Sequence, residues 1–250
     1  MVSETLYSFE SVPKLPITIH QSLITIHKSQ ITNMTRKLII ISVLIGMLTA
    51  VFAQEKESTD VSRFYGGVRV GFTASQISGD DLTGFHKVGA HAGGFVNHAI
   101  VPSGRLKLQL ELDFTMKGSH SHTPKNVIAD NFYSLTLGYM EVPLMLVWTA
   151  GKWQLWGQKF NFELEIGPAF GVHVFTRERE ANGLIVGRPP FRWYEFSGLA
   201  GISLMVADHH SVNFRFENSI IPVRIPTWVY DRVVYKQFNT LLTFSYCYQF

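Results

Sequence analysis

Charged side chains with one common spacing are the residues of this chain that could do chemistry. Each has an odd number, and each lies in a run where polar and apolar residues alternate. Side chains two residues apart on a β-strand point to the same side, so equal parity predicts that all of them face one interior. Such a set can form buried ion pairs, line a narrow path for ions or protons, or hold a small ligand. The set is Arg69, Lys107, Glu111, Asp113, Glu141, Glu163, Glu165, Arg215 and Glu217.

The free-energy cost of burying a charge favours one interpretation of these residues, a buried network in which each charge is paired. A closed barrel of eight strands leaves a lumen just wide enough for side chains. Charges in so narrow a space must be paired or hydrated, because an unpaired buried charge is expensive. We therefore predict a salt-bridged plug that holds the barrel rigid. A narrow ion or proton path and a small-ligand pocket at the outer mouth are the alternatives.

Other reactive residue types are present, but they form no strong motif. His120 and His122 lie two apart in a polar stretch and could bind a transition metal weakly, although a solvated loop explains them better. Residues 208–210, "DHH", are interpreted as a tight turn, in which Asp is common. Cys247 is the only cysteine, so it has no internal disulfide partner, and its odd number predicts a small interior filler. The sequence therefore predicts no catalytic residue, no metal site and no cofactor.

The elements that must position the charged set are β-strands. From Leu106 to Met116 every even residue is apolar, and from Lys107 to Lys117 every odd residue is polar. Such alternation indicates a strand with one apolar and one polar face. The same parity recurs along the chain, with no helical period between the runs. The predicted strands cover residues 64–76, 86–100, 105–118, 138–149, 159–175, 194–206, 211–218 and 238–250.

The connections and the composition together indicate what the apolar face touches. Short and long connections alternate, as in outer-membrane barrels, whose long loops lie outside the cell. Charged residues are 16% of the chain and aromatic residues 13%, whereas soluble domains carry roughly 25% charged residues. Aromatic side chains gather near strand ends, as interfacial belts do; they are Trp148, Phe160, Tyr194, Tyr248 and Phe250. The even-numbered face is therefore expected to contact outer-membrane lipid.

These patterns predict an all-β fold over residues 63–250: an eight-stranded, antiparallel, up-and-down transmembrane β-barrel. The alternative is a soluble periplasmic eight-stranded barrel that binds a ligand, with its apolar face turned inward. A net charge of +3 is too small to argue for nucleic acid as a partner.

The segment before the barrel has the pattern of a targeting signal. A basic pair precedes an uncharged run over residues 38–52, and small residues end that run. This predicts a signal peptide over residues 34–53, cleaved after Ala53, because a membrane-spanning helix needs about 20 apolar residues. The protein is therefore expected to be exported.

Two flanking segments complete the predicted domain organisation. Residues 1–33 are interpreted as an artefact of the assigned start, with Met34 as the true start, or as a disordered leader. Residues 54–62 are expected to form a short periplasmic segment before the barrel.

Four stretches resemble the PorT-like outer-membrane β-barrel proteins of Bacteroidota. They are "GGVRVGFTASQISGDD", "GYMEVPLML", "FELEIGPAFGV" and the aromatic last strand ending in "SYCYQF", and the resemblance covers residues 63–250. It implies a multi-pass protein of the cell outer membrane. It also implies insertion by the outer-membrane assembly machinery, which reads the last strand, here ending at Phe250. The family's namesake takes part in protein secretion, and a link of this chain to secretion is an analogy.

The function predicted is that of a non-enzymatic outer-membrane barrel whose external loops bind a protein partner or stabilise the envelope. The best loop is "SIIPVRIPTWVYDRVVYK", because it combines the residue types that anchor interfaces. A small outer-membrane enzyme is the alternative within the membrane, and an extension of the last two strands is the alternative for the loop. Its candidate binding residues are Arg224, Trp228, Tyr230, Arg232 and Tyr235.

Overall fold

A computed structural model describes most of the predicted barrel region. The described residues are 64–79, 84–121, 132–180, 183–184, 190–224, 228–229, 232–233 and 236–250, with Thr35, Ile39 and Ser42 as single helical positions. The chain divides into two compact units, Met1–Ile40 and Ile41–Phe250. Among the described residues, no helix has the length and hydropathy needed to cross a bilayer.

The predicted targeting segments fall almost entirely beyond this part of the chain. The leader 1–33, the cleavage position Ala53 and the segment 54–62 lie outside the described residues. Those three statements therefore stay predictions.

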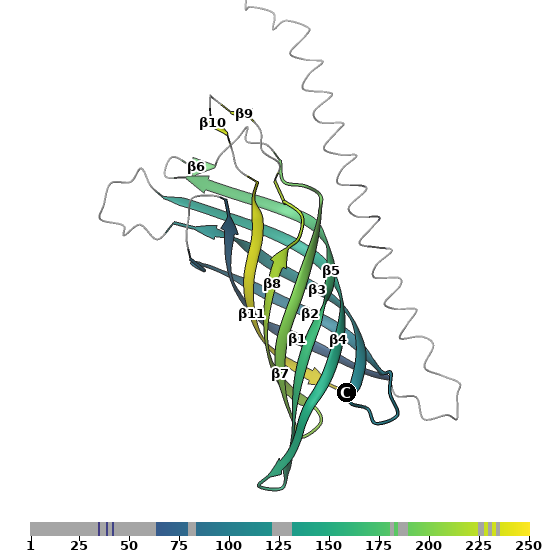
Figure 1. The fold of residues 1–250 in the computed structure, drawn as a ribbon. Helices are drawn as coiled ribbons and strands as arrows, with labels where there is room; N and C mark the ends of the chain where they lie inside the picture. The colour runs from purple at the N-terminus through teal and green to yellow at the C-terminus, as the bar shows by residue number, and fades with distance from the viewer. Residues whose placement is uncertain are drawn as a thin grey trace, which may run out of the picture. The chain divides into compact units, whose positions relative to one another are not determined.

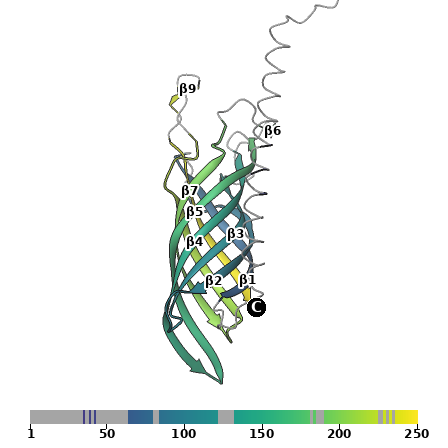
Figure 2. The same ribbon diagram turned by 90° about the vertical axis from the view of Figure 1, so that its right-hand side faces the viewer.

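Eight antiparallel strands close into a ring in the second unit (Figures 1 and 2). Neighbours in the chain are neighbours in the ring, and pairing of the first strand with the last closes it. The predicted all-β, eight-stranded, antiparallel fold is therefore confirmed. The ring strands are β1 (Phe64–Ser78), β2 (Lys87–Ala99), β3 (Leu106–His120), β4 (Tyr133–Leu155), β5 (Gln158–Glu180), β7 (Tyr194–Val206), β8 (His210–Ser219) and β11 (Phe238–Gln249).

Three two-residue strands lie in the long connections. β6 (Gly183–Leu184) pairs with the end of β5, and β9 (Trp228–Val229) pairs with β10 (Arg232–Val233) in a separate small sheet.

Strand alternation separates the two faces of the ring as the sequence predicts. Val70 and Phe72 of β1 point outward and are 60% and 52% exposed, whereas Arg69 before them and Thr73 after them are buried. In β3, Gln109, Glu111 and the following odd residues are buried in the same way. An apolar exterior around a polar interior is the inverse of a soluble barrel, and it is the arrangement that lipid requires.

The two ends of the ring differ in their connections. The short-turn rim, as we name it, carries the connections 100–105, 156–157 and 207–209, together with the start of β1 and the end of β11. The long-loop rim carries the connections 79–86, 121–132, 181–193 and 220–237. Two-residue turns need positive φ angles, and Trp156 and Gly157 supply them at 50° and 77°.

The structure differs from the predicted strand limits at β4 and β5. Both strands have 23 residues, so the connection expected after residue 149 is instead a continued hairpin. Register shifts occur between Gly138 and Tyr139 and between Thr149 and Gly151. A β-bulge inserts one residue and reverses the inside–outside parity beyond it, which explains why simple alternation did not reveal these extensions.

Candidate functional site

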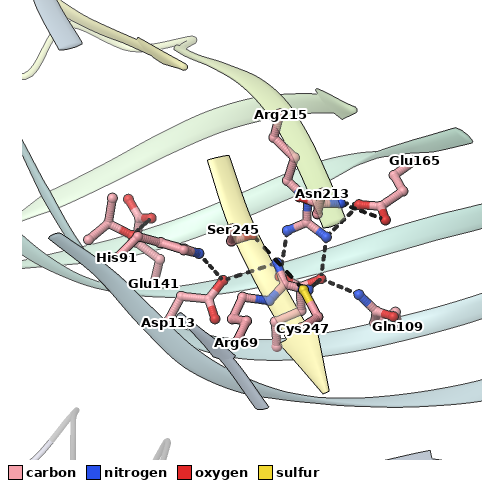
Figure 3. A network of polar contacts seen from close by, with 12 residues as sticks. Arg69, His91, Gln109, Asp113, Glu141, Glu165, Asn213, Arg215, Ser245 and Cys247 are labelled. Carbon is pink, nitrogen blue, oxygen red and sulfur yellow. Dashed lines mark hydrogen bonds and ion pairs between the residues drawn. The ribbon is translucent and has the colours of Figure 1, made fainter. Parts of the chain in front are cut away.

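Two buried arginines, Arg69 and Arg215, lie within an ion-paired network in the lumen (Figure 3). Glu111 of β3 accepts hydrogen bonds from Nη1 and Nη2 of Arg215 on β8, at 2.7 and 2.8 Å. The Nη1 and Nη2 atoms of Arg69 on β1 lie 2.9 and 3.1 Å from the same carboxylate. Gln109 donates a further hydrogen bond to Glu111. All three charged groups of this cluster are removed from water, so each depends on its partners.

A second carboxylate continues the network across the barrel. Nε of Arg215 donates to Glu165 of β5 at 2.7 Å, and the side-chain amide of Asn213 donates to the other oxygen at 2.9 Å. Arg215 therefore ties together β3, β5 and β8, of which β3 pairs with neither of the others.

Asp113 lies beside the arginine cluster with looser contacts. Its Oδ2 atom is 3.8 Å from Nη1 of Arg69 and 3.8 Å from Nε2 of His91 on β2. The other ring nitrogen of His91 is 3.2 Å from the hydroxyl of Thr115. These contacts bring β2 into the network.

Nearer the long-loop rim, one lysine faces three carboxylates. Nζ of Lys117 lies 2.5 Å from Glu141, 3.2 Å from Glu195 and 2.5 Å from Glu217. The ammonium group is also 5.1 Å from the ring centre of Tyr139. Since Lys117 is buried, its charge is compensated by these carboxylates and not by water.

Nearer the short-turn rim, one isolated pair completes the set. Nζ of Lys107 lies 2.6 Å from Glu163, and the Thr149 hydroxyl donates to the same oxygen at 3.1 Å. The nine predicted residues thus all point inward and all take part in ionic contacts. This geometry fits the predicted plug.

An apolar cluster lies above the charged layers at the outer mouth. Ring strands contribute most of it, and Phe191 and Val223 enter it from the long connections. Beside it, Nη2 of Arg224 lies 3.0 Å from Glu178, and the guanidinium lies 4.0 Å from the ring centre of Phe191. The Tyr133 hydroxyl donates to the other Glu178 oxygen at 2.6 Å. The buried cluster consists of Ile77, Leu135, Leu137, Tyr139, Phe191 and Val223.

The candidate loop residues have different positions. Arg224 is 3% exposed and belongs to the mouth contacts just described, so it holds the base of the loop and presents no free charge. Trp228 and Arg232 lie in β9 and β10, whose backbones pair. Tyr230 and Tyr235 lie outside the described residues.

Three interior charges were missing from the predicted set. Lys117 and Glu195 have odd numbers in alternating runs, so the same parity argument could have found them. Glu178 has an even number. It points inward because the register of the β4–β5 pairing shifts between Gly138 and Tyr139, and this shift reverses the inside–outside parity of the β5 residues beyond it. No local sequence signal marks that bulge.

The cysteine, the histidines and the turn aspartate, which the sequence offered as weaker candidates for reactive or metal-binding residues, gain little support from the structure. Cys247 is buried, with Sγ 4.0 Å from the Ser245 hydroxyl. The His120 ring packs against Phe132, and His122 lies outside the described residues. Asp208 pairs with Lys159 on the surface. Over the residues that the structure describes, no group of three or more His, Cys, Asp and Glu side chains has a geometry for metal.

An eight-stranded antiparallel ring with an apolar exterior and an ion-paired interior defines a transmembrane β-barrel. The family model described as "Outer membrane protein beta-barrel domain" matches residues 52–224, and the chain belongs to that family. It is therefore an outer-membrane β-barrel protein.

Solved structures of similar fold come from three bacterial sources. Ail of Yersinia pestis, in complex with the heparin analogue sucrose octasulfate, is 9% identical with a TM-score of 0.39, covering 75% of this chain and 99% of its own. Neisserial surface protein A is 10% identical with a TM-score of 0.38, covering 76% and 98%. OprG of Pseudomonas aeruginosa is 11% identical with a TM-score of 0.38, covering 76% and 97%. No curated protein matches the chain.

Proposed function

We propose that this chain is a non-enzymatic outer-membrane barrel whose long loops bind a protein partner outside the cell. The observation that carries the proposal is the plugged lumen: charged layers and an apolar cluster occupy the barrel interior from one rim to the other. Interior side chains that are committed to each other are not free to bind substrate. The loops of the long-loop rim are then the surface on which a function can be built.

The loop of residues 219–236 is the segment that we propose as the contact surface. Its base is fixed at two points: the Val223 amide donates to the Gln237 carbonyl at 2.8 Å, and Arg224 forms a bridge with Gln237 and an ion pair with Glu178. A base held in this way would reduce the entropy lost when the loop binds. Trp228 and Arg232 in the paired β9 and β10 are of the types that anchor interfaces.

The finer parts of the proposal concern export and assembly. We propose that residues 34–53 direct export, that cleavage follows Ala53, and that the assembly machinery recognises the last strand ending at Phe250. A link to protein secretion rests on the PorT resemblance alone and is the more specific form of the same hypothesis.

Cross-linking in the native membrane tests the loop assignment. Residues 226–235 are replaced by a short Gly-Ser linker, which keeps Val223, Arg224 and Gln237 in place. Residues 123–130, in another long connection, are replaced by the same linker as the control. Folding of both variants is checked by the gel shift between unheated and boiled samples.

The proposal expects one cross-linked protein with the parent chain and with the control, and its loss with the 226–235 variant. Loss in both variants, or in neither, would contradict the loop assignment. If the parent cross-links to no protein but its deletion makes cells sensitive to detergent, envelope stability replaces partner binding as the function.

A further inference from the structure

The β4–β5 hairpin extends beyond the ring at the short-turn rim. β3 begins at Leu106, which pairs with Trp148, and β7 ends at Val206, which pairs with Phe160. Residues 150–155 of β4 therefore have no β3 partner, and the hairpin tip over residues 154–159 has no ring strand on either side. We name residues 150–159 the ribbon, and Figure 1 shows this hairpin projecting past the other turns of the rim. Outer-membrane barrels ordinarily have short turns here, so this extension requires its own explanation.

The ribbon has one apolar and one polar face. Trp153 pairs with Phe160 and Leu155 with Gln158, and the Trp153 and Phe160 rings stack with centres 6.2 Å apart. The other face carries Lys152 opposite Asn161 and Gln154 opposite Lys159. An amphipathic element of this kind suits a boundary between apolar and aqueous surroundings.

The apolar face of the ribbon continues the lipid-facing surface of the barrel. The register shift between Thr149 and Gly151 leaves one extra residue, Ala150, in β4. This bulge moves the outward positions of β4 from even to odd numbers, so that Trp148, Trp153 and Leu155 lie on the same outer side. Without it, Trp153 and Leu155 would face the axis of the barrel. The bulge thus keeps aromatic side chains on the side where the bilayer lies.

The tip of the ribbon carries the most exposed large apolar side chain of the described barrel. Trp156 is 90% exposed, and Trp153 and Leu155 are 46% and 47% exposed. Side chains of this size on a free tip need an apolar cover. Tryptophan is the residue that favours the membrane interface.

Cationic side chains on the ribbon indicate the charge of the surface that it meets. Lys152 and Lys159 are exposed, and the ammonium group of Lys159 pairs with Asp208 in a contact that is open to solvent. Arg105 lies exposed at the neighbouring turn. Lysine and arginine beside an apolar face favour anionic lipid headgroups.

We propose that residues 150–159 anchor the barrel in the phospholipid leaflet at the short-turn rim. Trp153, Leu155 and Trp156 lie at the boundary between headgroups and acyl chains, and Lys152 and Lys159 contact lipid phosphates. The ligand class is an anionic glycerophospholipid. Continuity with the lipid-facing belt favours this occupant over a soluble periplasmic protein or a second copy of the chain.

Tryptophan quenching in nanodiscs tests the anchor. Single barrels are refolded into discs of phosphatidylcholine and phosphatidylglycerol, with bromine on the acyl chains near the headgroup or near the bilayer centre. The emission of Trp156 is obtained as the difference between the parent chain and Trp156→Phe, which preserves an aromatic side chain at the turn. Trp193→Phe, at the opposite rim, is the matched control.

The anchor requires that the Trp156 emission fall at least two-fold with bromine near the headgroup and resist aqueous iodide. Emission that iodide quenches and brominated lipid does not would overturn the proposal, because it would place the Trp156 side chain in water. Lys152→Gln with Lys159→Gln should reduce the quenching by brominated lipid in anionic discs but not in discs of phosphatidylcholine alone. An equal effect in both lipids would overturn the role assigned to the lysines.

Discussion

Glu111 of β3 and Arg215 of β8 form a two-pronged ion pair through the lumen, with N–O distances of 2.7 and 2.8 Å. The two strands do not pair with each other in the ring, so this contact joins walls that the backbone hydrogen bonds leave separate. Bidentate carboxylate–guanidinium pairs are among the stronger polar contacts and fix geometry as well as energy. The pair therefore braces the barrel internally.

Glu111→Leu should lower the free energy of unfolding by about 3–5 kcal/mol, because it leaves the guanidinium groups of Arg69 and Arg215 buried without their shared partner. Urea titration of the refolded protein in lipid vesicles measures the loss. Asp208→Asn is the control, since the surface pair with Lys159 should contribute no more than about 1 kcal/mol. Equal losses for the two variants would contradict the internal brace.

Lys117→Met should also destabilise the barrel by about 3–5 kcal/mol, because it leaves Glu141, Glu195 and Glu217 without their common cation. Glu217→Gln added to Lys117→Met should recover part of that loss by removing one of the three repelling charges. The same urea titration, applied as a double-mutant cycle, measures the recovery. A further loss in the double variant would show that Lys117 does not compensate these carboxylates.

Parity was sufficient to predict that the nine charged residues point inward, because the period of a strand is two and the register holds across most of the ring. The same reasoning could not predict which of these charged residues form ion pairs with each other. Which strands face each other across a lumen depends on tilt and stagger of the whole barrel, so the pairing of Glu111 with Arg215 leaves no local signal in the sequence.

The two regions whose orientation the sequence alternation did not predict share one physical cause. Glu178 turns inward, and the ribbon of residues 150–159 turns its aromatic side chains outward, because each lies beyond a bulge that reverses parity. Bulges depend on the fit between two strands, and neither strand shows them alone. The burial of Arg224 could not be predicted from the sequence for a related reason, because its partner Glu178 lies 46 residues away in the chain.

The plugged lumen should prevent porin-like conduction. In a planar bilayer the refolded protein should show no large, stable conductance steps, because eight strands leave no open channel and side chains fill the interior. A porin of larger strand number, reconstituted in the same lipid, is the positive control. Repeated uniform steps from the purified barrel would contradict the plug.

The mature chain should begin at Gln54, within two residues, because cleavage is predicted after Ala53. Intact mass of the protein extracted from native membranes measures the start. With Ala53→Leu the uncleaved precursor should accumulate, because the cleavage site requires a small residue directly before the cut. Recovery of residues 1–53 on the membrane-inserted parent would contradict the signal-peptide interpretation.

Depth along one strand tests which face meets lipid. Leu106 and Leu110 lie on the same outward side of β3, Leu106 at the short-turn rim and Leu110 four residues further into the ring, where it pairs with Val96 and Leu144. Leu110→Arg should lower the free energy of unfolding in vesicles by about 2–4 kcal/mol, because it puts a cation near the bilayer midplane. Leu106→Arg should cost no more than about 1 kcal/mol, since its guanidinium can reach the headgroups. An apolar protein core offers no such gradient, so equal losses for the two variants would place the even-numbered face against something other than a bilayer.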